Sequence, residues 1–305
     1  MAFKTYGGAK TEVAHDGLRK WKIHVLVVFL VRPKQKKVIE FPKTSKMVLN
    51  NYYRETGNKN KRIIPVRHTQ KTAIISIIAL GIVSTPAMAV EISGGDINLK
   101  YSELDAEIFG EKLNSFSVDG AVELGFSPNF AAQLDLGYYN FGAIDDNGTT
   151  VALHGIYHLN DETSLGAFYG QDELDGDSDF YGIEAVYETG KFEVEGYIGS
   201  TDNEGEDAGI LGLYGAYGLT ERLDVTGGYQ IADLDDGSLD RIEVGLKFKP
   251  VDEAVLSVSF GSAEVEAFGE SGSESFFSIG VEFPLGANKG ATFGRRGILQ
   301  LLPGL

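Results

Sequence analysis

The 305-residue sequence contains no cysteine, only 1 tryptophan and only 3 methionines. Without cysteine the chain can form neither a disulfide framework nor a thiolate metal site. A domain that works outside the cytoplasm without disulfides needs another stabilising device. A closed β-barrel, which pairs the edges of all its strands, is one such device.

Positive charge is scarce in one part of the chain and concentrated in the other. Residues 1–89 hold 17 Lys and Arg against 4 Asp and Glu, whereas residues 90–305 hold 10 against 40. Such an abrupt change indicates two pieces with different fates. The acidic part also lacks Gly-rich phosphate loops, zinc-ligand spacings and basic patches of the kind that bind nucleic acid. We therefore expect no cofactor, no metal site and no nucleic-acid partner.

Long apolar runs are absent as well, and the one beside the charge change is short. Lys71 precedes the run Thr72–Val83, which small residues follow up to Ala87 and Ala89. A basic flank, an apolar core of this length and an A-x-A box predict a cleaved signal peptide over residues 66–89. The run falls short of the roughly 20 residues that a spanning helix needs. Residues 90–305 are therefore predicted to be exported.

Residues 1–65 fit no part of such a signal and remain an unassigned basic extension. We hypothesise that translation starts later, at Val66 through an alternative start codon or at Met47. A basic arm for nucleic acid is the alternative interpretation. Mass spectrometry of the unprocessed N-terminus distinguishes the two.

The exported part has the alternation of β-strands throughout. Between Leu223 and Ile231, for example, apolar side chains occupy every second position and polar ones the positions between, as on a strand with one apolar face. No segment of similar length shows a helical apolar stripe. Twelve segments have strand character: 95–104, 114–126, 130–142, 149–160, 164–172, 179–189, 191–201, 209–220, 222–233, 239–250, 254–263 and 275–284.

The connections between these segments alternate in kind. One set is short, such as Ser127–Asn129 and Thr220–Arg222. The other set is predicted to form longer, acidic loops: 105–112, 144–148, 172–178, 201–207, 233–238 and 264–274. Outer-membrane barrels combine short turns at one end with longer loops at the other and an even strand count. The sequence therefore predicts an all-β fold, a transmembrane antiparallel up-and-down barrel of about 12 strands over residues 90–286. A soluble periplasmic β-sandwich is the remaining alternative.

The A-x-A site, the mature start Val90–Leu104 and the last strand with its continuation, Ser278–Gly286, resemble Gram-negative porins, particularly those of alphaproteobacteria. The resemblance implies an outer-membrane location, contact with outer-membrane lipid and lipopolysaccharide, and a passive channel for small hydrophilic solutes or ions. Homotrimers are typical of that family. The chain departs from general diffusion porins in having room for about twelve strands rather than sixteen and no long third loop. It also continues past the last strand as residues 287–305, which we expect to form a C-terminal periplasmic tail, as a short helix or a plug.

The polar faces of the predicted strands are rich in carboxylates. An acidic lumen attracts cations and repels anions, so we expect a modest cation preference. The alternative is a non-conducting barrel with a structural or surface-binding role, its lumen filled by side chains. The predicted pore-lining residues are Asp119, Glu123, Asp135, Glu184, Glu193, Glu195, Glu243, Lys247 and Glu282.

Two further patterns bear on metal binding and on enzyme activity. The acidic stretches Asp172–Asp179 and Asp233–Asp240 lack the ligand spacing of an EF-hand, so loose Ca²⁺ or Mg²⁺ binding is the weaker hypothesis there. His154 and His158 share one strand face, but no motif like that of omptin-like proteases accompanies them. No enzyme activity is predicted.

Overall fold

The computed structural model describes residues 90–108, 111–142, 146–174, 176–203, 206–234, 237–267, 270–286 and 290–302. The predicted basic extension (1–65) and signal peptide (66–89, with Ala87 and Ala89) lie outside these ranges. Within them, the one helical element is a single 3₁₀ turn, η1 (Leu299–Leu301). No helix in the described part of the chain is long and apolar enough to cross a membrane.

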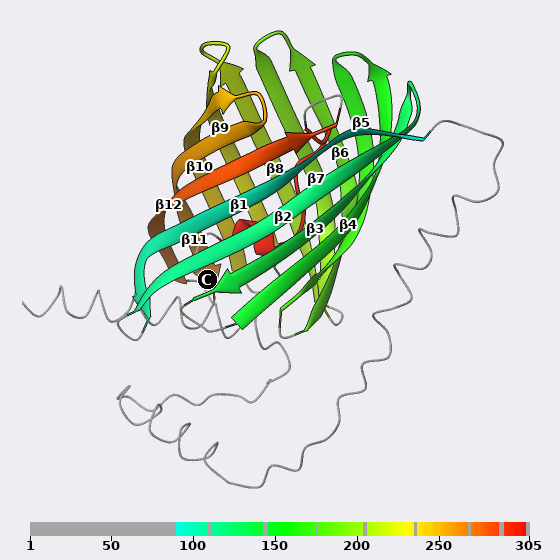
Figure 1. Ribbon diagram of the computed structural model, residues 1–305. Coiled ribbons are helices and arrows are strands. Elements are labelled where there is room, and N and C mark those ends of the chain that lie inside the picture. Colours follow the sequence, from blue (N-terminus) through cyan, green and yellow to red (C-terminus); the bar gives the residue numbers. More distant parts are fainter. Residues whose placement is uncertain are drawn as a thin grey trace, which may run out of the picture. The chain divides into compact units, whose positions relative to one another are not determined.

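Twelve antiparallel strands form one closed barrel, as predicted (Figure 1). Each strand pairs with its neighbours in the chain, and the first strand pairs with the last to close the wall. All twelve segments expected from alternation are strands. They are β1 (Glu91–Ile108), β2 (Glu111–Ser127), β3 (Phe130–Phe141), β4 (Asp146–Asn160), β5 (Thr163–Glu173), β6 (Asp177–Thr189), β7 (Phe192–Asn203), β8 (Glu206–Gly218), β9 (Leu223–Leu234), β10 (Gly237–Val251), β11 (Ala254–Ala267) and β12 (Glu270–Leu285).

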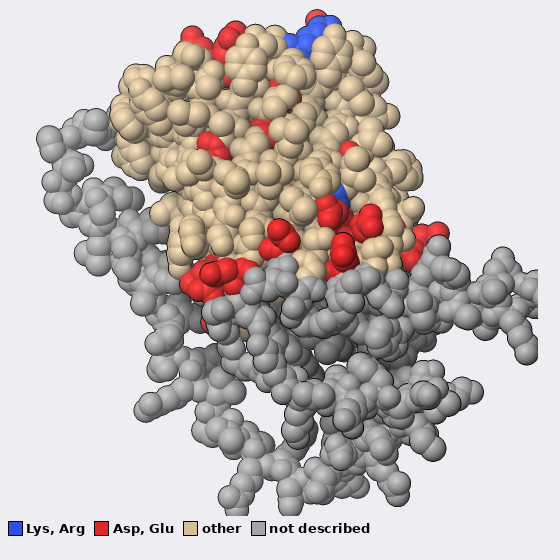
Figure 2. Space-filling model, turned by 180° about the vertical axis from the view of Figure 1, so that it is seen from behind, with Lys and Arg blue, Asp and Glu red and all other residues tan. Residues whose placement is uncertain are grey.

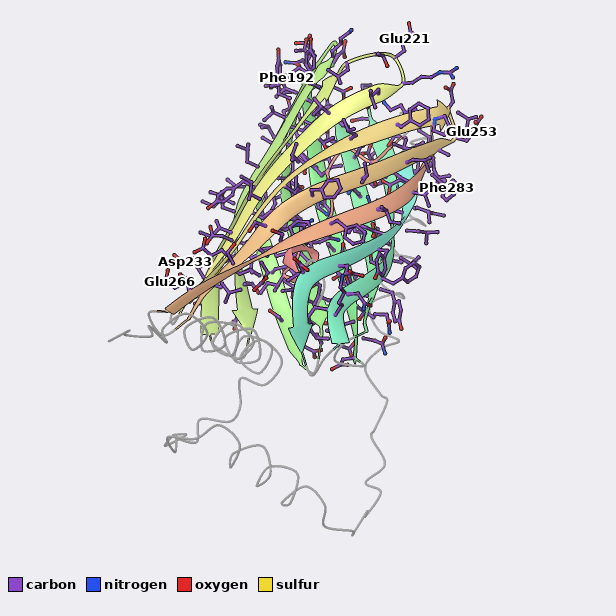
Figure 3. All side chains as sticks on the ribbon, turned by 90° about the vertical axis from the view of Figure 1, so that its left-hand side faces the viewer. Phe192, Glu221, Asp233, Glu253, Glu266 and Phe283 are labelled. Atoms are coloured by element: carbon purple, nitrogen blue, oxygen red, sulfur yellow. The ribbon has the colours of Figure 1, made fainter. Side chains whose placement is uncertain are left out.

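The two ends of the barrel differ less in loop length than the sequence suggested. Most of the residues expected to form long acidic loops instead extend the strands. The register of β11 and β12, for example, continues to the pair Ala267–Glu270. Strand pairing tolerates charged side chains there, because beyond the membrane the outward face of a strand meets water. We call the end with connections 128–129, 161–162, 190–191, 219–222 and 252–253 the turn end, and the opposite end the loop end. Figure 3 labels Glu221 and Glu253 at the turn end and Asp233 and Glu266 at the loop end.

The outer wall of the barrel is apolar. Side chains that point outward leave large hydrophobic residues exposed on every strand, among them Ile183 (63% exposed), Ile242 (59%) and Phe260 (61%). On the face seen in Figure 2, most of the wall carries no charge, and Asp and Glu gather mainly toward the loop end. Exposed apolar area of this extent is stable against lipid rather than water.

Exposed aromatic side chains form two belts on this wall. One follows the turn end (Phe126, Phe130, Tyr157, Tyr187, Phe192, Tyr217, Phe248, Phe283), and the other lies nearer the loop end (Phe116, Tyr138, Tyr169, Tyr181, Tyr229, Phe260). Aromatic girdles at both membrane interfaces are typical of outer-membrane barrels. In lipid, a closed barrel also leaves no backbone group unpaired. The fold is therefore that of a barrel that spans the outer membrane.

Candidate functional site

Residues 290–302, which we call the C-terminal segment, lie inside the barrel (Figure 1). The chain leaves β12 through Gly286, whose positive φ of 77° favours glycine. Gly290 passes so close to β1 that a Cβ on Gly94 would lie 2.0 Å from the Gly290 carbonyl oxygen. Of the two forms expected for the tail, a short helix or a plug, residues 290–302 have that of a plug, and they contain the single 3₁₀ turn η1. The reason lies in the polar wall of the lumen, whose carboxylates bind this segment.

Arg296 is the largest fully buried side chain of the described residues. Its Nε donates to Glu184 Oε2 at 2.9 Å, and its Nη2 lies 2.7 Å from the same oxygen and also donates to Glu195. The guanidinium carbon lies 4.4 Å from the ring centroid of Tyr197 and 5.7 Å from that of Phe168. Two carboxylates and two aromatic rings thus enclose one permanently charged group.

Arg295 binds a second pair of carboxylates. Its Nη1 donates to Asp96 Oδ2 at 3.0 Å, its Nη2 donates to the other oxygen of Asp96, and its Nε lies 3.0 Å from Asp119. The Arg295 side chain is 14% exposed, whereas that of Arg296 is 0% exposed. The two adjacent arginine side chains therefore differ in burial: Arg295 is partly exposed, and Arg296 is fully buried.

Backbone amides of the C-terminal segment bind further acidic side chains. The N–H groups of Thr292, Gly294 and Ile298 donate to Glu123 (2.9 Å), Glu195 (3.1 Å) and Asp172 (2.6 Å), respectively. Charged acceptors make such hydrogen bonds stronger than neutral ones. The carboxylates that line the lumen therefore act here as a receptor for the chain's own C-terminal segment.

Gln133 and Phe293 fix the register of the segment. Gln133 donates through Nε2 to the Phe293 carbonyl oxygen at 2.7 Å and accepts from the Phe293 N–H at 3.1 Å. The side-chain amide of Gln133 thus bonds both backbone groups of Phe293, as the backbone of a neighbouring strand would. The Phe293 ring is buried and stacks near the imidazole of His154, with the ring centroids 6.3 Å apart.

His154 joins two of the predicted pore-lining carboxylates. Its Nδ1 lies 2.7 Å from Glu184 Oε1, and its Nε2 lies 3.1 Å from Asp135 Oδ2. Both ring nitrogens are thus engaged, and the side chain is fully buried. His154 therefore orders the wall beneath the C-terminal segment. His158, on the same face, lies 2.8 Å from Ser164 Oγ.

The half of the lumen nearer the loop end is filled by apolar side chains, which we call the apolar cluster. Leu299, Leu301 and Leu302 of the C-terminal segment pack there and are at most 5% exposed. Gln300 lies between these leucines in the sequence. Its carbonyl oxygen accepts a hydrogen bond from Arg241 Nη1 at 2.6 Å, and its side-chain amide donates to the Tyr139 hydroxyl. The wall contributes Leu104, Leu113, Tyr139, Phe141, Ala152, Phe168, Phe180, Tyr197, Ile210, Ala232, Leu239, Ala263 and Phe276.

The half nearer the turn end holds a cavity of about 1230 Å³. Turn residues such as Asn129 and Asp252 line its mouth, and Phe293, Arg295 and Arg296 line its inner end. None of the buried members of the apolar cluster lines this cavity. The cluster therefore lies between the cavity and the loop end.

The structure places all nine predicted pore-lining residues on the inner face, but in two different settings. Asp119, Glu123, Asp135, Glu184 and Glu195 are at most 7% exposed and lie around the C-terminal segment or His154. Glu193, Glu243, Lys247 and Glu282 line the cavity, which Asp119 and Glu195 of the first group line as well. Sequence reasoning missed Asp96, Asp172, Arg295 and Arg296, although a Gly-Arg-Arg-Gly sequence after a run of acidic strands was a usable signal.

The acidic stretches considered for Ca²⁺ do not gather ligands within the described residues. No group of three or more His, Asp or Glu side chains there has the arrangement of a metal site. Asp172 instead points inward, accepts a hydrogen bond from Thr150 and caps the backbone of Ile298.

Comparison with known proteins gives architecture alone. The sequence matches no protein-family model and no curated protein. Among solved structures, the chain is similar to the NanC porin, with 11% identity and a TM-score of 0.48 over 63% of this chain and 100% of that one. It is similar to the KdgM porin with 11% identity and a TM-score of 0.47 over 62% of this chain and 98% of that one. It is also similar to an outer membrane channel from Pseudomonas putida F1 (12%, 0.45, 66% and 97%).

Proposed function

We propose that the chain is a porin-like passive channel for small hydrophilic solutes or ions across the outer membrane, with a preference for cations. The observation that carries the proposal is the cavity at the turn end, whose lining holds more acidic side chains, Glu193, Glu243 and Glu282 among them, than basic ones (Lys247, Lys249, Arg295 and Arg296). An excess of carboxylates in a low-dielectric wall concentrates cations and repels anions. By analogy with other barrels, the turn end faces the periplasm.

In this proposal the C-terminal segment closes the path. It crosses the lumen between the cavity and the apolar cluster, and its leucines complete that cluster. Hydrophobic constrictions stop ion flow by excluding water. The full-length chain is therefore expected to conduct weakly or in rare openings, and conduction requires that the segment leave its site.

The apolar cluster also favours a second candidate function, that of a non-conducting barrel with a structural or surface-binding role. In that case the C-terminal segment is a permanent part of the core. The two candidates share the fold and differ in whether the segment is ever displaced.

The test is single-channel recording of the full-length exported chain and of a variant that ends at Gly286, both extracted from outer membranes. A salt gradient across the bilayer gives the ion preference. Discrete conductance steps with a cation-selective reversal potential, larger in the shortened variant, support the channel. A shortened variant that is folded and silent supports the non-conducting barrel.

The partners of the proposed channel follow from its location. Outer-membrane lipid contacts the apolar wall, and lipopolysaccharide would meet the acidic loop end through divalent cations. A homotrimer belongs to the proposal only through the resemblance to porins. The mass of the protein after extraction in a mild detergent tests whether it is a trimer.

A further inference from the structure

The enclosure of Arg296 has the composition of a binding site for a planar cation. Glu184 and Glu195 supply charge and hydrogen-bond acceptors at the edge of the guanidinium group, and Tyr197 and Phe168 supply aromatic rings near its carbon. All four residues belong to the barrel wall, on β5, β6 and β7, and all four are at least nine-tenths buried. The wall therefore supplies every partner of the guanidinium group in this enclosure, and the segment supplies the cation.

Each component favours guanidinium over a simple ammonium ion. Arginine presents a rigid fork of N–H donors that can bind two carboxylates in one plane, and it stacks on aromatic faces because it is weakly hydrated. An ammonium ion is compact and strongly hydrated, so it loses more on entering a dry site. The pocket thus discriminates by shape and hydration as well as by charge.

The pocket is also reachable from the turn end. Glu195 and Arg296 both line the inner end of the cavity, whose mouth opens among the turns. A small cation that enters the cavity therefore arrives beside Glu195, one of the two carboxylates that hold Arg296, and Arg296 itself separates it from the rest of the site. Because Arg296 is tethered to the same chain, it competes at a high effective concentration, and a free ligand binds only when the segment withdraws.

We propose that Phe168, Glu184, Glu195 and Tyr197 form a guanidinium-binding site of the lumen, which the chain's own Arg296 occupies and which guanidinium-bearing solutes enter in its place. The identification of such solutes as cargo or blockers rests on the proposed channel function, but the site itself does not. Exchange between Arg296 and the solute then couples ligand binding to the position of the C-terminal segment.

The experiment is chemical rescue of the full-length R296A variant. N-Ethylguanidinium replaces the atoms that the substitution removes, whereas ethylammonium has the same charge and no fork. Melting of the detergent-solubilised barrel is followed at increasing concentrations of each cation. We expect a saturable rise in melting temperature with N-ethylguanidinium, with an affinity about tenfold higher than that of ethylammonium. The wild-type chain should show no such rise.

Two control variants sharpen the result. In R296A combined with E184Q and E195Q, the response to N-ethylguanidinium should be lost. In R295A, where the arginine is partly exposed and no aromatic ring of the described residues lies over its guanidinium group, the two cations should differ little. Equal responses of R296A to both cations, or a response that survives the loss of both carboxylates, would overturn the proposal.

If R296A does not fold unaided, refolding yield replaces melting as the measurement. Recovery of folded barrel with N-ethylguanidinium, and not with ethylammonium, supports the site, and equal yields refute it. Because neither measurement needs ion flow, a silent barrel that still binds N-ethylguanidinium separates failure of the channel from failure of the site. A barrel that conducts but responds equally to N-ethylguanidinium and ethylammonium shows that the site has failed and the channel has not.

Discussion

The two halves of the lumen hold the same C-terminal segment by opposite means. Toward the turn end, arginines and backbone amides meet carboxylates beside a cavity of about 1230 Å³. Toward the loop end, Leu299, Leu301 and Leu302 pack into the apolar cluster, whose buried members do not line that cavity. Polar contacts have direction and so set where the segment sits, whereas apolar contacts exclude water. The polar half therefore positions the segment, and the apolar half excludes water around it.

Removal of the segment tests both halves at once and should have the largest effect. A chain that ends at Gly286 loses the leucines of the seal and the arginines that neutralise Asp96, Asp119, Glu184 and Glu195. We expect single-channel conductance to rise by at least about tenfold and the cation preference to strengthen. Planar-bilayer recording checks both. An unchanged conductance in a barrel that still shows heat-modifiable migration would contradict the seal.

The substitution R296A tests the polar half through its sealed site. It leaves two buried carboxylates without their partner, and breaking a buried ion pair in this way costs about 3–5 kcal/mol. Urea unfolding in detergent measures the loss of free energy. R295A is the matched control: its partners Asp96 and Asp119 are also buried, but the Arg295 side chain is 14% exposed, so we expect a smaller loss. Equal losses would show that burial does not distinguish the two arginines.

The substitution L301A tests the apolar half. Leu301 is 1% exposed, and truncating a buried leucine costs about 2–3 kcal/mol through lost transfer energy and the cavity left behind. We also expect a small leak current in the otherwise intact chain, because water enters the seal. L301M, which conserves volume, should lose less than about 1.5 kcal/mol and show no leak. A leak that is absent from L301A would place the seal elsewhere.

The substitution E193Q should have the smallest effect on stability. Glu193 is exposed and lines the cavity, and no described residue of the C-terminal segment forms a hydrogen bond or ion pair with it, so the free energy of unfolding should change by less than about 0.5 kcal/mol. In the chain that ends at Gly286, the same substitution should move the reversal potential slightly toward zero, since one lumen charge is lost. A shift as large as that of E195Q in the same background would show that the two settings of lumen carboxylates are equivalent.

Local pattern was sufficient to predict the wall but not its contents. Alternation along Leu223–Ile231 and similar segments depends only on which residues are two apart, and it correctly gave twelve strands and the inward direction of Glu123, Glu184 and Glu195. The C-terminal segment has no periodic pattern, and its partners are distant in sequence. Asp96, for instance, precedes Arg295 by 199 residues. Such contacts follow from closure of the barrel, which no local pattern encodes.

The loop ends were mispredicted for a related reason. Acidic and glycine residues between Glu264 and Glu274 suggested a loop, since both kinds are depleted in strands. Beyond the membrane, however, the outward face of a strand is solvated: Glu264 and Glu266 are exposed, Ala263 is buried on the inner face, and backbone pairing continues from Ser262 to Ala267. Composition alone does not distinguish a solvated strand from a solvated loop.

The contacts of the C-terminal segment also have a consequence for the order of assembly. Its partners Asp96, Glu123, Gln133, Asp172, Glu184, Glu195 and Arg241 come from β1, β2, β3, β5, β6, β7 and β10. No open sheet presents these residues around one axis, so the docking surface for the segment exists only once β1 has met β12. The segment that follows the last strand is thus expected to dock after the barrel has closed, and its burial then reports that closure.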